Sequence, residues 1–574
     1  MITGRKWLIA EPPPDGFKLN LGSFASGVVD SLATRLLWNR GIRSNSDAEH
    51  YFADGLHDLL DPFELPEMNL AVTRISRAIT TGETIGVFGD FDVDGLTGTA
   101  IVLRIIRSIG GKAIPYIPNR EMDGHGLSLQ AIDSFLDAGV TLITTVDTGS
   151  TAVNEIAYAR SKGIDTVVTD HHLIETDRPE AVAIVNPHVQ SDKETTIASN
   201  KPISYSGAGV AFKLAQALAY DSGHEFPEQL LPLAALGTIA DIVPLVSENR
   251  TLVREGLRVF GQTELVGLQS LLETSRAPGA SARPNSELVS FYIAPRLNAP
   301  GRLGDAEPSL QILTTDNLIE AQTLAARLDA DNQKRRSLSE DAWKHAITQV
   351  NVNSDDPIVA VSCNGFPMGL LGPLAGRLNE LSGKPAIAYQ LVNGVIRASC
   401  RSNNGLDLHA TLSTHANDFE RFGGHARAAG FSIQHESLNQ LLEDIRKQAL
   451  AGTQGEPNAP VLDADAELQL EDLTLPLWNF VSSMEPFGEA NREPIFVTFG
   501  AKPIDVRTVG AGGKHLKLGF EIAGERVDSI GFGLGDRPLG SGSVDIVYQL
   551  RSDVWRGRIR HQLGLRDIRP SAHQ

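Results

Sequence analysis

The stretch GVFGDFDVDGLTGTAIVLRII, residues 86–106, decides the fold of the first half of the chain. The apolar run at residues 85–88 predicts a buried strand, and the apolar residues after Gly95 predict a helix. Between them, aspartates occupy every second position: Asp90, Asp92 and Asp94. Like charges at this spacing repel one another, so we expect these side chains to face bound divalent cations.

The composition is that of a long chain with several globular domains. It has 574 residues, of which 41% are hydrophobic and 21% are charged, which is enough for several separate cores. No stretch approaches the roughly 20 apolar residues of a membrane span, and prolines interrupt the N-terminal segment before a secretory signal could form. We therefore expect a cytoplasmic protein that does not bind membranes. Its two cysteines, Cys363 and Cys400, are too few for a disulfide framework.

The formal net charge of −19 argues against a protein that binds nucleic acid over its whole surface. It does not exclude a local basic groove, because arginines gather at residues 421–430 and 551–562. The distribution of charge therefore matters more than its sum.

Residues 66–265 alternate apolar, strand-like runs with polar loops and helical patterns. The runs are TIGVFGD, AIPYIP, TLITTVD, DTVVTD and VAIVNP. This alternation predicts an α/β fold with an open parallel sheet and crossover helices. In such sheets, ligands bind at the carboxyl ends of the strands.

Acidic and histidine residues follow several of these runs. Asp147 ends TLITTVD, and the triplet Asp170, His171 and His172 follows TVVT. Asp241 comes after a helix-like segment. A single aspartate after a strand is usually a helix cap, but the repetition of such clusters at the strand ends of one sheet indicates a metal site.

The donor types favour particular metals. Carboxylates and imidazoles without a nearby thiolate suit Mn²⁺ or Mg²⁺ better than a structural zinc. The ligands are too many for one ion. They fit two cations about 3.5 to 4 Å apart, bridged by one carboxylate, an arrangement that activates water and stabilises the leaving oxygen of a phosphodiester.

The rest of the chain predicts four further units. We expect a helical N-terminal segment at 1–65, a connector with a long polar helix at 266–350, a second α/β lobe at 351–450 and a β-barrel at 460–574. An OB-fold is the natural candidate for the barrel, because this fold binds single strands by basic and stacking contacts. Its candidate contacts are Trp555, Arg556, Lys514 and Lys517, although a tryptophan in a barrel is core as often as stacking platform.

The successive motifs GDFDVDG, VDTG, TDHH and GTIADIVPL resemble those of the DHH phosphoesterase superfamily. Three later runs narrow the resemblance to the RecJ family of single-stranded-DNA exonucleases: APRLNAPGRLGDA (294–306), GGHARAAGF (423–431) and MEPFGEANREPIF (484–496). The resemblance implies a DHH catalytic domain at 66–265, a DHHA1 substrate-binding domain at 351–450 and an OB-fold at 460–574. It also implies a two-metal enzyme that degrades single-stranded DNA from the 5′ end to 5′-mononucleotides.

The same resemblance implies a role in DNA repair and recombination. By family analogy, we expect a monomer that acts on single-stranded DNA together with a single-stranded-DNA-binding protein and a helicase. Two other functions stay open: a DHH phosphodiesterase for short oligonucleotides or cyclic dinucleotides, and a catalytically inactive scaffold. The acidic clusters argue against the scaffold, and the C-terminal domain and long connector argue against the small-substrate enzyme.

The resemblance assigns roles around the metals. The implied ligands are Asp92, Asp94, Asp147, His171 and Asp241, with Asp147 as the bridge and Asp90 as a further ligand or a supporting group. His172 is expected to contact the scissile phosphate, and Asp170 to orient one of the histidines. Phe88 stands where many small DHH phosphoesterases carry a histidine ligand, so we expect an acidic group or water to replace that ligand.

The remaining assignments concern substrate. Ser399 and Arg401 lie two residues apart on an expected strand and share a face, and they match residues that hold the 5′-phosphate together with Arg120. Pairing with neighbouring strands, or a solvated loop position for Arg120, is the alternative. Gly423, Gly424 and His425 suit phosphate binding. Arg296, Asn298 and Arg302 lie in a Pro-interrupted, helix-poor stretch and either close over the active site or staple domains together. The loop at 363–373 lacks the Trp-His pair that is usual in the family.

Overall fold

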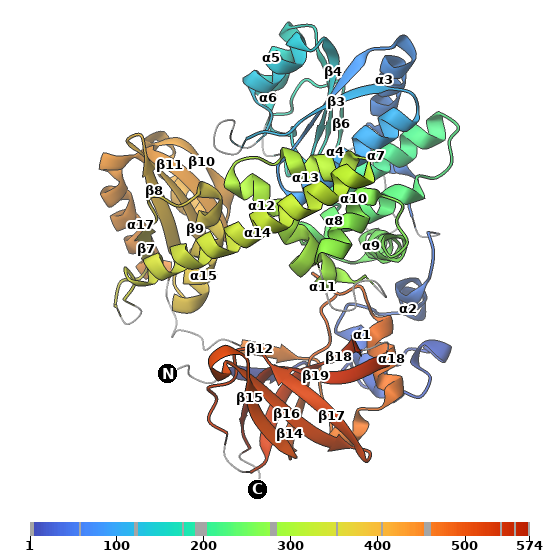
Figure 1. Cartoon of the computed structure of the whole chain (residues 1–574), viewed down its shortest axis with the longest axis vertical. Coiled ribbons are helices and arrows are strands. Elements are labelled where there is room, and N and C mark those ends of the chain that lie inside the picture. The colour runs from blue at the N-terminus through green and yellow to red at the C-terminus, as the bar shows by residue number, and fades with distance from the viewer. Residues whose placement is uncertain are drawn as a thin grey trace.

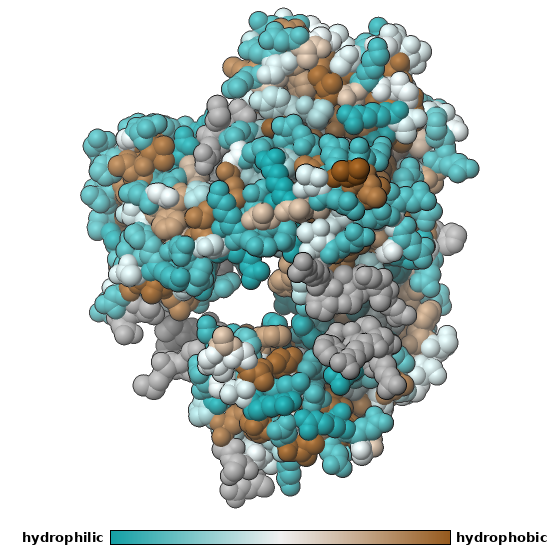
Figure 2. Space-filling model, in the orientation of Figure 1, coloured by the Kyte–Doolittle hydropathy of each residue, from teal (hydrophilic) through white to brown (hydrophobic). Residues whose placement is uncertain are grey.

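The computed structural model describes residues 5–56, 59–119, 124, 126–174, 177–189, 204–275, 284–351, 354–402, 406–452, 461–539, 542–555 and 558–571. It shows two α/β lobes, joined by the long helix α14 (Leu318–Ile347), and a C-terminal β unit (Figure 1). Figure 2 shows an opening between the second lobe, the middle helices and the C-terminal unit. Among the described residues, no helix is long and apolar enough to cross a membrane.

The first lobe confirms the predicted parallel sheet. Its strands are hydrogen-bonded in the order β3-β2-β4-β5-β6, and every pair is parallel. Their bounds are β2 Thr84–Gly89, β3 Lys112–Tyr116, β4 Val140–Val146, β5 Asp165–Thr169 and β6 Ala183–Val185.

Both faces of this sheet are covered by helices. Val87 packs in a core with α3 (Met68–Thr81), α4 (Val93–Ser108) and α7 (Gly207–Asp221). The next residue, Phe88, packs on the opposite side with α5 (Leu129–Asp137) and α6 (Val153–Ser161). Because side chains alternate along a strand, a strand buried on both faces is apolar throughout. Polar side chains can therefore gather at the carboxyl ends of the strands, where helices do not cover the sheet.

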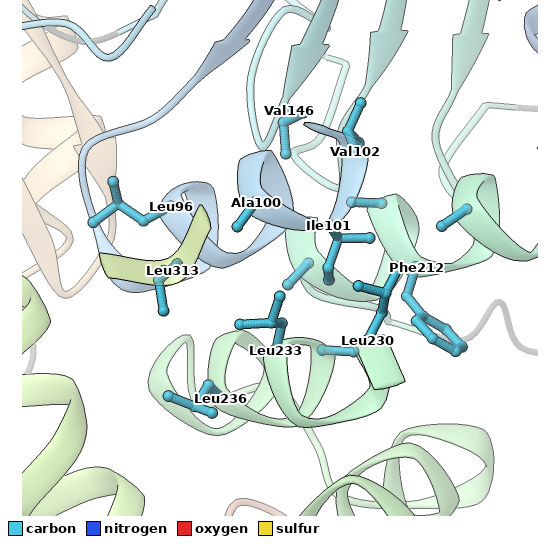
Figure 3. Close-up of a cluster of buried hydrophobic side chains, with 14 of the residues drawn as sticks. Leu96, Ala100, Ile101, Val102, Val146, Phe212, Leu230, Leu233, Leu236 and Leu313 are labelled. Carbon is cyan, nitrogen blue, oxygen red and sulfur yellow. The ribbon is translucent and has the colours of Figure 1, made fainter. Parts of the chain in front are cut away.

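Helix α4 lies at the centre of the first lobe. Asp92 caps it, because its Oδ1 accepts hydrogen bonds from the amides of Asp94 and Gly95, at 3.0 and 3.1 Å. Figure 3 shows side chains of α4, among them Leu96, Ala100 and Ile101, in one cluster with Val146 of β4, Phe212 of α7 and Leu233 of α8 (Leu231–Ala240). The predicted strand and helix around the aspartates are therefore built into the deepest part of the core.

The middle of the chain is helical. It comprises α9 Ser247–Phe260, α10 Val266–Ser275, α11 Ser286–Leu288, the π-helix η4 Val289–Ile293, α12 Ala294–Leu303 and α13 Glu307–Thr314. The expectation of a helix-poor stretch around Arg296 was wrong, because α12 contains it. Pro295 lies in the first turn of α12, where a helix needs no amide hydrogen bond.

The predicted connector is α14, which is 30 residues long. Leu324 and Leu328 near its start belong to the core of the first lobe. Ala342 and Ala346 near its end belong to a core of the second lobe. The helix is therefore anchored at both ends.

The second lobe is a mixed sheet in the order β10-β11-β9-β8-β7, in which only β7 and β8 are parallel. Its strands are β7 Val359–Ser362, β8 Ala386–Val392, β9 Val395–Arg401, β10 Phe419–His425 and β11 Ala428–Gln434. The helices α15 (Leu371–Ser382), α16 (Leu408–Ser413) and α17 (Leu438–Gly452) pack against it.

The C-terminal unit confirms the β prediction, with one difference. Its described strands form an open seven-stranded sheet in the order β13-β14-β18-β19-β17-β16-β15, so hydrogen bonds between the described strands do not close a barrel. The strands are β13 Ala466–Glu467, β14 Phe496–Ala501, β15 Asp505–Val509, β16 His515–Ile522, β17 Glu525–Gly531, β18 Val544–Trp555 and β19 Arg558–Pro570. Helix α18 (Leu475–Ser483) packs on this sheet.

The N-terminal segment packs into this C-terminal unit. Leu36 and Leu37 of α1 (Asp30–Trp38) and Phe52 of α2 (Asn45–Phe52) share one core with Trp478 and Tyr548. Strand β1 (Lys6–Ile9) also pairs in parallel with β12 (Val461–Ala464). The two ends of the chain thus make one structural unit, which the sequence patterns did not predict.

The shared core predicts that a change in the N-terminal segment destabilises the C-terminal sheet. Leu37 is fully buried, so Leu37→Ala should lower the free energy of unfolding of this unit by about 2 to 5 kcal/mol. Hydrogen exchange of the β16 and β18 amides measures the effect. Leu8→Ala is the matched control, because Leu8 is 42% exposed. Equal protection of these amides in Leu37→Ala and Leu8→Ala would contradict the shared core.

Candidate metal centre and substrate cleft

The predicted acidic and histidine residues meet at the carboxyl edge of the first sheet. They form three overlapping groups in which one donor atom per residue lies within 4.8 Å of the others: Asp147, His171 and His172; Asp94, His171 and Asp241; Asp90, Asp92 and Asp147. Asp147 and His171 each belong to two groups. An arrangement with shared members suits two neighbouring cations better than one.

Asp147 is the most constrained of these residues. It is 5% exposed and has a φ of 60°, a left-handed conformation that is uncommon outside glycine and occurs at functional sites. Burial raises its pKa well above the usual value, and the charges of Asp94, Asp92, Asp90 and Asp170 raise it further. A cation placed among these carboxylates would relieve the repulsion.

The Oδ1 atom of Asp147 shows that a cation fits. It is buried and makes no hydrogen bond with the described residues. The Nε2 atom of His171 nevertheless lies only 3.0 Å from it. This carboxylate oxygen and this imidazole nitrogen lie close together without the alignment of a hydrogen bond, as two ligands of one metal ion do.

Asp94 and Asp241 complete the second group. Asp94 is 1% exposed and accepts hydrogen bonds from the amides of Gly207 (2.6 Å) and Ala208 (2.9 Å) at the start of α7. Burial raises the pKa of Asp94, and Asp92 adds to the effect. Burial, Asp94 and Asp92 raise the pKa of Asp241 to about 8. Asp241 therefore favours a proton at neutral pH until a cation takes its place.

Two glycines that the sequence patterns missed allow this close packing. A Cβ atom on Gly207 would lie 2.6 Å from Oδ1 of Asp147, and one on Gly237 would lie 2.5 Å from Oδ1 of Asp94. The available signal was the segment SGAG at 206–209, in which Ser206 caps α7 by accepting from the amide of Gly209 at 3.1 Å. The backbone of α7 can reach the carboxylates only because these positions lack side chains.

His172 and Asp170 form a pair beside the metal groups. The two lie 2.7 Å apart between Nδ1 and Oδ1. This hydrogen bond raises the pKa of His172 to about 9, and, despite the burial of Asp170, it helps to lower the pKa of that carboxyl to about 2. Asp170 also accepts from the amide of Ser150 at 2.9 Å. His172 is therefore a cation at neutral pH, held by Asp170, as the predicted orienting role requires.

Phe88 does not reach this site. It is fully buried and stacks on Tyr116 with ring centroids 5.7 Å apart, on the side of the sheet that α5 and α6 cover. Asp90 instead shares a group with Asp92 and Asp147. This placement agrees with the expectation that an acidic residue replaces the missing histidine.

A cavity of about 1040 Å³ separates the metal centre from the second lobe. His172 lines one side, and the predicted residues Ser399, Arg401, Gly423, Gly424 and His425 line the other. Nη1 of Arg401 donates to Oγ of Ser399 at 3.2 Å. The structure thus brings the residues predicted for phosphate binding to the same cavity as His172, one of the residues predicted for catalysis.

Gly372 is a further member of this cleft that the sequence patterns missed. It lies in the first turn of α15, and a Cβ atom there would be 3.0 Å from Nη2 of Arg401 and 3.4 Å from Oγ of Ser399. Leu371 and Gly372 line the same cavity as Ser399 and Arg401, and the amide of Leu371 already donates to the carbonyl of Met368. A helix N-terminus beside an arginine favours an anion. The loop at 363–373 therefore contributes to the cleft although it lacks the expected Trp-His pair.

The segment around α12 holds the lobes together. Arg296 pairs with Asp329 of α14 at 2.7 Å, and Nη1 of Arg302 donates to the carbonyl of Gly369 in the second lobe at 3.1 Å. Asn298 is half-buried on the same helix. For Arg302, this contact favours the stapling alternative, whereas the pair of Arg296 and Asp329 lies within the first lobe.

The other predicted contacts are less defined. Arg120 and Arg556 lie outside the described residues, and the side chain of Trp555 is not described. Lys514 is exposed in the C-terminal unit, and Lys517 pairs with Asp528 at 3.3 Å.

Comparison with known families and proteins agrees with this arrangement. Residues 84–238 match the DHH family, N-terminal domain; residues 355–450 match the DHHA1 domain; and residues 464–567 match the RecJ OB domain. The chain is 33% identical to the single-stranded-DNA-specific exonuclease RecJ of Bacillus subtilis, over 99% of this chain and 71% of that protein. It is 32% identical to the Escherichia coli protein of the same name, over 94% of this chain and 96% of that protein.

A solved structure has the same overall architecture. RecJ of Thermus thermophilus in complex with Mn²⁺ matches with a TM-score of 0.82 and 29% identity, over 98% of this chain and 79% of that chain. A structure of RecJ from the same organism with Mg²⁺ matches with a TM-score of 0.76 and 27% identity, over 99% and 79% of the two chains.

The close approach at Gly207 gives a prediction for metal binding. Gly207→Ala should weaken Mn²⁺ binding by roughly tenfold or more, because the added methyl displaces the Asp147 carboxylate. Titration calorimetry on the full chain measures this affinity. The control is Gly376→Ala on α15, where nothing lies within 4 Å of the new methyl, and where Mn²⁺ affinity should stay at the wild-type value. Wild-type Mn²⁺ affinity in Gly207→Ala would show that the packing around Asp147 is not tight.

Proposed function

Because the chain belongs to the RecJ family of DHH phosphoesterases, we propose that it is a metal-dependent exonuclease specific for single-stranded DNA. It hydrolyses phosphodiester bonds in the 5′-to-3′ direction and releases 5′-mononucleotides. The observation that supports the proposal is the cavity that Ser399 and Arg401 of the second lobe share with His172 of the first. Such a cleft suits a strand whose terminal phosphate is held while the next phosphate is cut.

The residues that would hold the metal are Asp90, Asp92, Asp94, Asp147, His171 and Asp241, with Asp147 shared between two ions. This oxygen-rich set fits Mn²⁺ or Mg²⁺. Two such cations, when bound, supply an activated water and neutralise charge on the leaving oxygen. The chain itself keeps the carboxylates close together by burial and by the amides of α7.

His172 serves as a cationic contact to the scissile phosphate. Its hydrogen bond to Asp170 keeps it protonated at neutral pH and fixes the ring. The bond to Asp170 is made by Nδ1. Nε2 of His172 can therefore donate to a phosphate oxygen in the cleft that His172 lines.

Ser399 and Arg401 hold the terminal 5′-phosphate beside the start of α15. A 5′-phosphate carries about two negative charges and calls for arginine, hydroxyl and amide donors. Arg120 is the proposed third side chain of this site. These donors share a cavity with His172, and we propose that one nucleotide spans it, so that each cut exposes a new 5′-phosphate.

The two other functions are less well supported. A phosphodiesterase for short oligonucleotides or cyclic dinucleotides would not need the C-terminal unit, whose sequence matches the RecJ OB domain over residues 464–567. A scaffold would not need buried carboxylates that repel one another. On the family resemblance alone, we also propose a cytoplasmic monomer that acts in DNA repair and recombination with a single-stranded-DNA-binding protein and a helicase.

The metal-centred mechanism predicts that Asp147→Ala abolishes cleavage of a labelled single strand in Mn²⁺ while the far-UV spectrum stays unchanged. Asp137→Ala is the control, because Asp137 is exposed at the end of α5, and it should cleave like the wild type. If Asp147→Ala kept more than about a tenth of the wild-type rate, the activation barrier would have risen by less than about 1.4 kcal/mol. That result would contradict the role of Asp147 as a ligand shared by two ions.

The end-binding site predicts a change in substrate preference. Arg401→Ala should slow the degradation of 5′-phosphorylated single strands far more than that of 5′-hydroxyl strands, which erases the preference between them. Arg397 lies on the same face of β9 but four residues away, about 13 Å along the strand, so Arg397→Ala should keep the preference. Digestion of 3′-labelled and 5′-labelled strands gives both the rates and the direction. Degradation from the 3′ end by the wild type would overturn the assignment.

A further inference from the structure

Three consecutive polar residues at the start of α9 are almost completely buried. Glu248, Asn249 and Arg250 are 1%, 2% and 4% exposed. Glutamate and arginine are rarely buried unless they are paired, so each side chain needs partners inside the protein. Their partners lie on separate elements, which together run from the C-terminal unit to the metal centre.

Glu248 bonds to the segment that begins α7. Its Oε1 accepts from Nζ of Lys213 at 2.8 Å, and its Oε2 accepts from the hydroxyl of Tyr205. Tyr205 directly precedes Ser206, the N-cap of α7. Glu248 therefore holds both the start and the body of the helix whose first amides bind Asp94.

Asn249 joins two segments beside the metal groups. Its Nδ2 donates to the carbonyl of Ser204 at 2.7 Å and to the carbonyl of Pro244 at 3.1 Å. Ser204 lies just before α7, and Pro244 lies three residues after Asp241. A single side-chain amide thus fixes the helix that binds Asp94 relative to the loop that carries Asp241.

Arg250 reaches in the other direction, to the C-terminal unit. Its guanidinium donates to the carbonyls of Met484 (3.1 Å) and Glu485 (2.9 Å), and its Nε donates to the carbonyl of Tyr51 in α2 (3.1 Å). The guanidinium also lies 3.8 Å from the centroid of the Tyr51 ring. The side chain of Arg250 therefore joins both the N-terminal segment and the loop before β14 to the first turn of α9.

We infer that Glu248, Asn249 and Arg250 are positioning residues through which the docking of the C-terminal unit sets the geometry of the metal centre. The C-terminal unit then affects turnover on every substrate, short or long, in addition to its affinity for long strands. The activity readout of this inference rests on the proposed function. Metal affinity tests the inference independently of that function.

The experiment compares three single variants of the full chain. Arg250→Lys and Asn249→Ala break the connection, whereas Arg40→Lys is the matched control. Like Arg250, Arg40 is a buried arginine, with a side chain 4% exposed. Its partners, however, lie within the unit that the two chain ends form: it makes a salt bridge of 3.0 Å to Asp465 and donates to the carbonyl of Arg492 at 2.6 Å. The measurements are Mn²⁺ affinity by calorimetry, kcat and KM on a short 5′-phosphorylated oligonucleotide, and melting temperature.

We expect Arg250→Lys and Asn249→Ala to weaken Mn²⁺ binding and to lower kcat by about 10- to 100-fold, with KM nearly unchanged. Arg40→Lys should lower the melting temperature but keep the wild-type Mn²⁺ affinity and kcat. If Arg250→Lys does not fold, Asn249→Ala, which leaves the contacts of Arg250 in place, still decides whether the first turn of α9 positions the metal groups.

Two results would overturn the inference: wild-type Mn²⁺ affinity in the variants of α9, or an equal loss of Mn²⁺ affinity in Arg40→Lys. A wild-type protein that binds Mn²⁺ but leaves single-stranded DNA intact would refute the proposed function instead. In that case, the order of Mn²⁺ affinities among the variants still decides the inference.

Discussion

The burial of carboxylates against one another is the constraint on which the rest of the structure depends. Asp94 and Asp147 are both nearly inaccessible to solvent, and each raises the free energy of charging the other. The fold tolerates this through backbone amides at the start of α7, through glycines that admit these amides, and through a left-handed residue at Asp147. These are features of a site shaped around positive charge.

The geometry between the two lobes follows from a rigid element. Helix α14 has 30 residues and therefore spans about 45 Å. Each end is fixed in the core of a different lobe, and the contact from Arg302 to the carbonyl of Gly369 adds a second link. The distance between the donors around Arg401, proposed to bind the terminal phosphate, and the carboxylates around Asp147 is thus set by packed secondary structure, as the proposed release of one nucleotide per cut requires.

The sequence predicted the features that depend on residues close together in the chain. The strand, the aspartates and the helix at residues 86–106 carry their own pattern, so the parallel sheet and the residues at its carboxyl edge could be inferred without a structure. Features that depend on distant contacts could not. Gly207 and Gly372 matter because of carboxylate and guanidinium groups far away in sequence, and α12 is helical although only one of its prolines occupies the first turn and Pro300 lies inside the helix. The polar triplet at 248–250 has the composition of a surface helix, and only its long-range partners explain its burial.

The shared core of the two chain ends has a consequence for synthesis on the ribosome. The hydroxyl of Tyr51 donates to Oδ1 of Asn491, 440 residues later in the chain. At about 5 to 20 residues per second, the N-terminal segment waits roughly 20 to 90 s for its partner to be translated. During this interval Leu36, Leu37 and Phe52 have no native core to enter. The nascent chain therefore exposes an apolar segment while the first lobe is already complete, and it is a natural client for chaperones that bind emerging polypeptides.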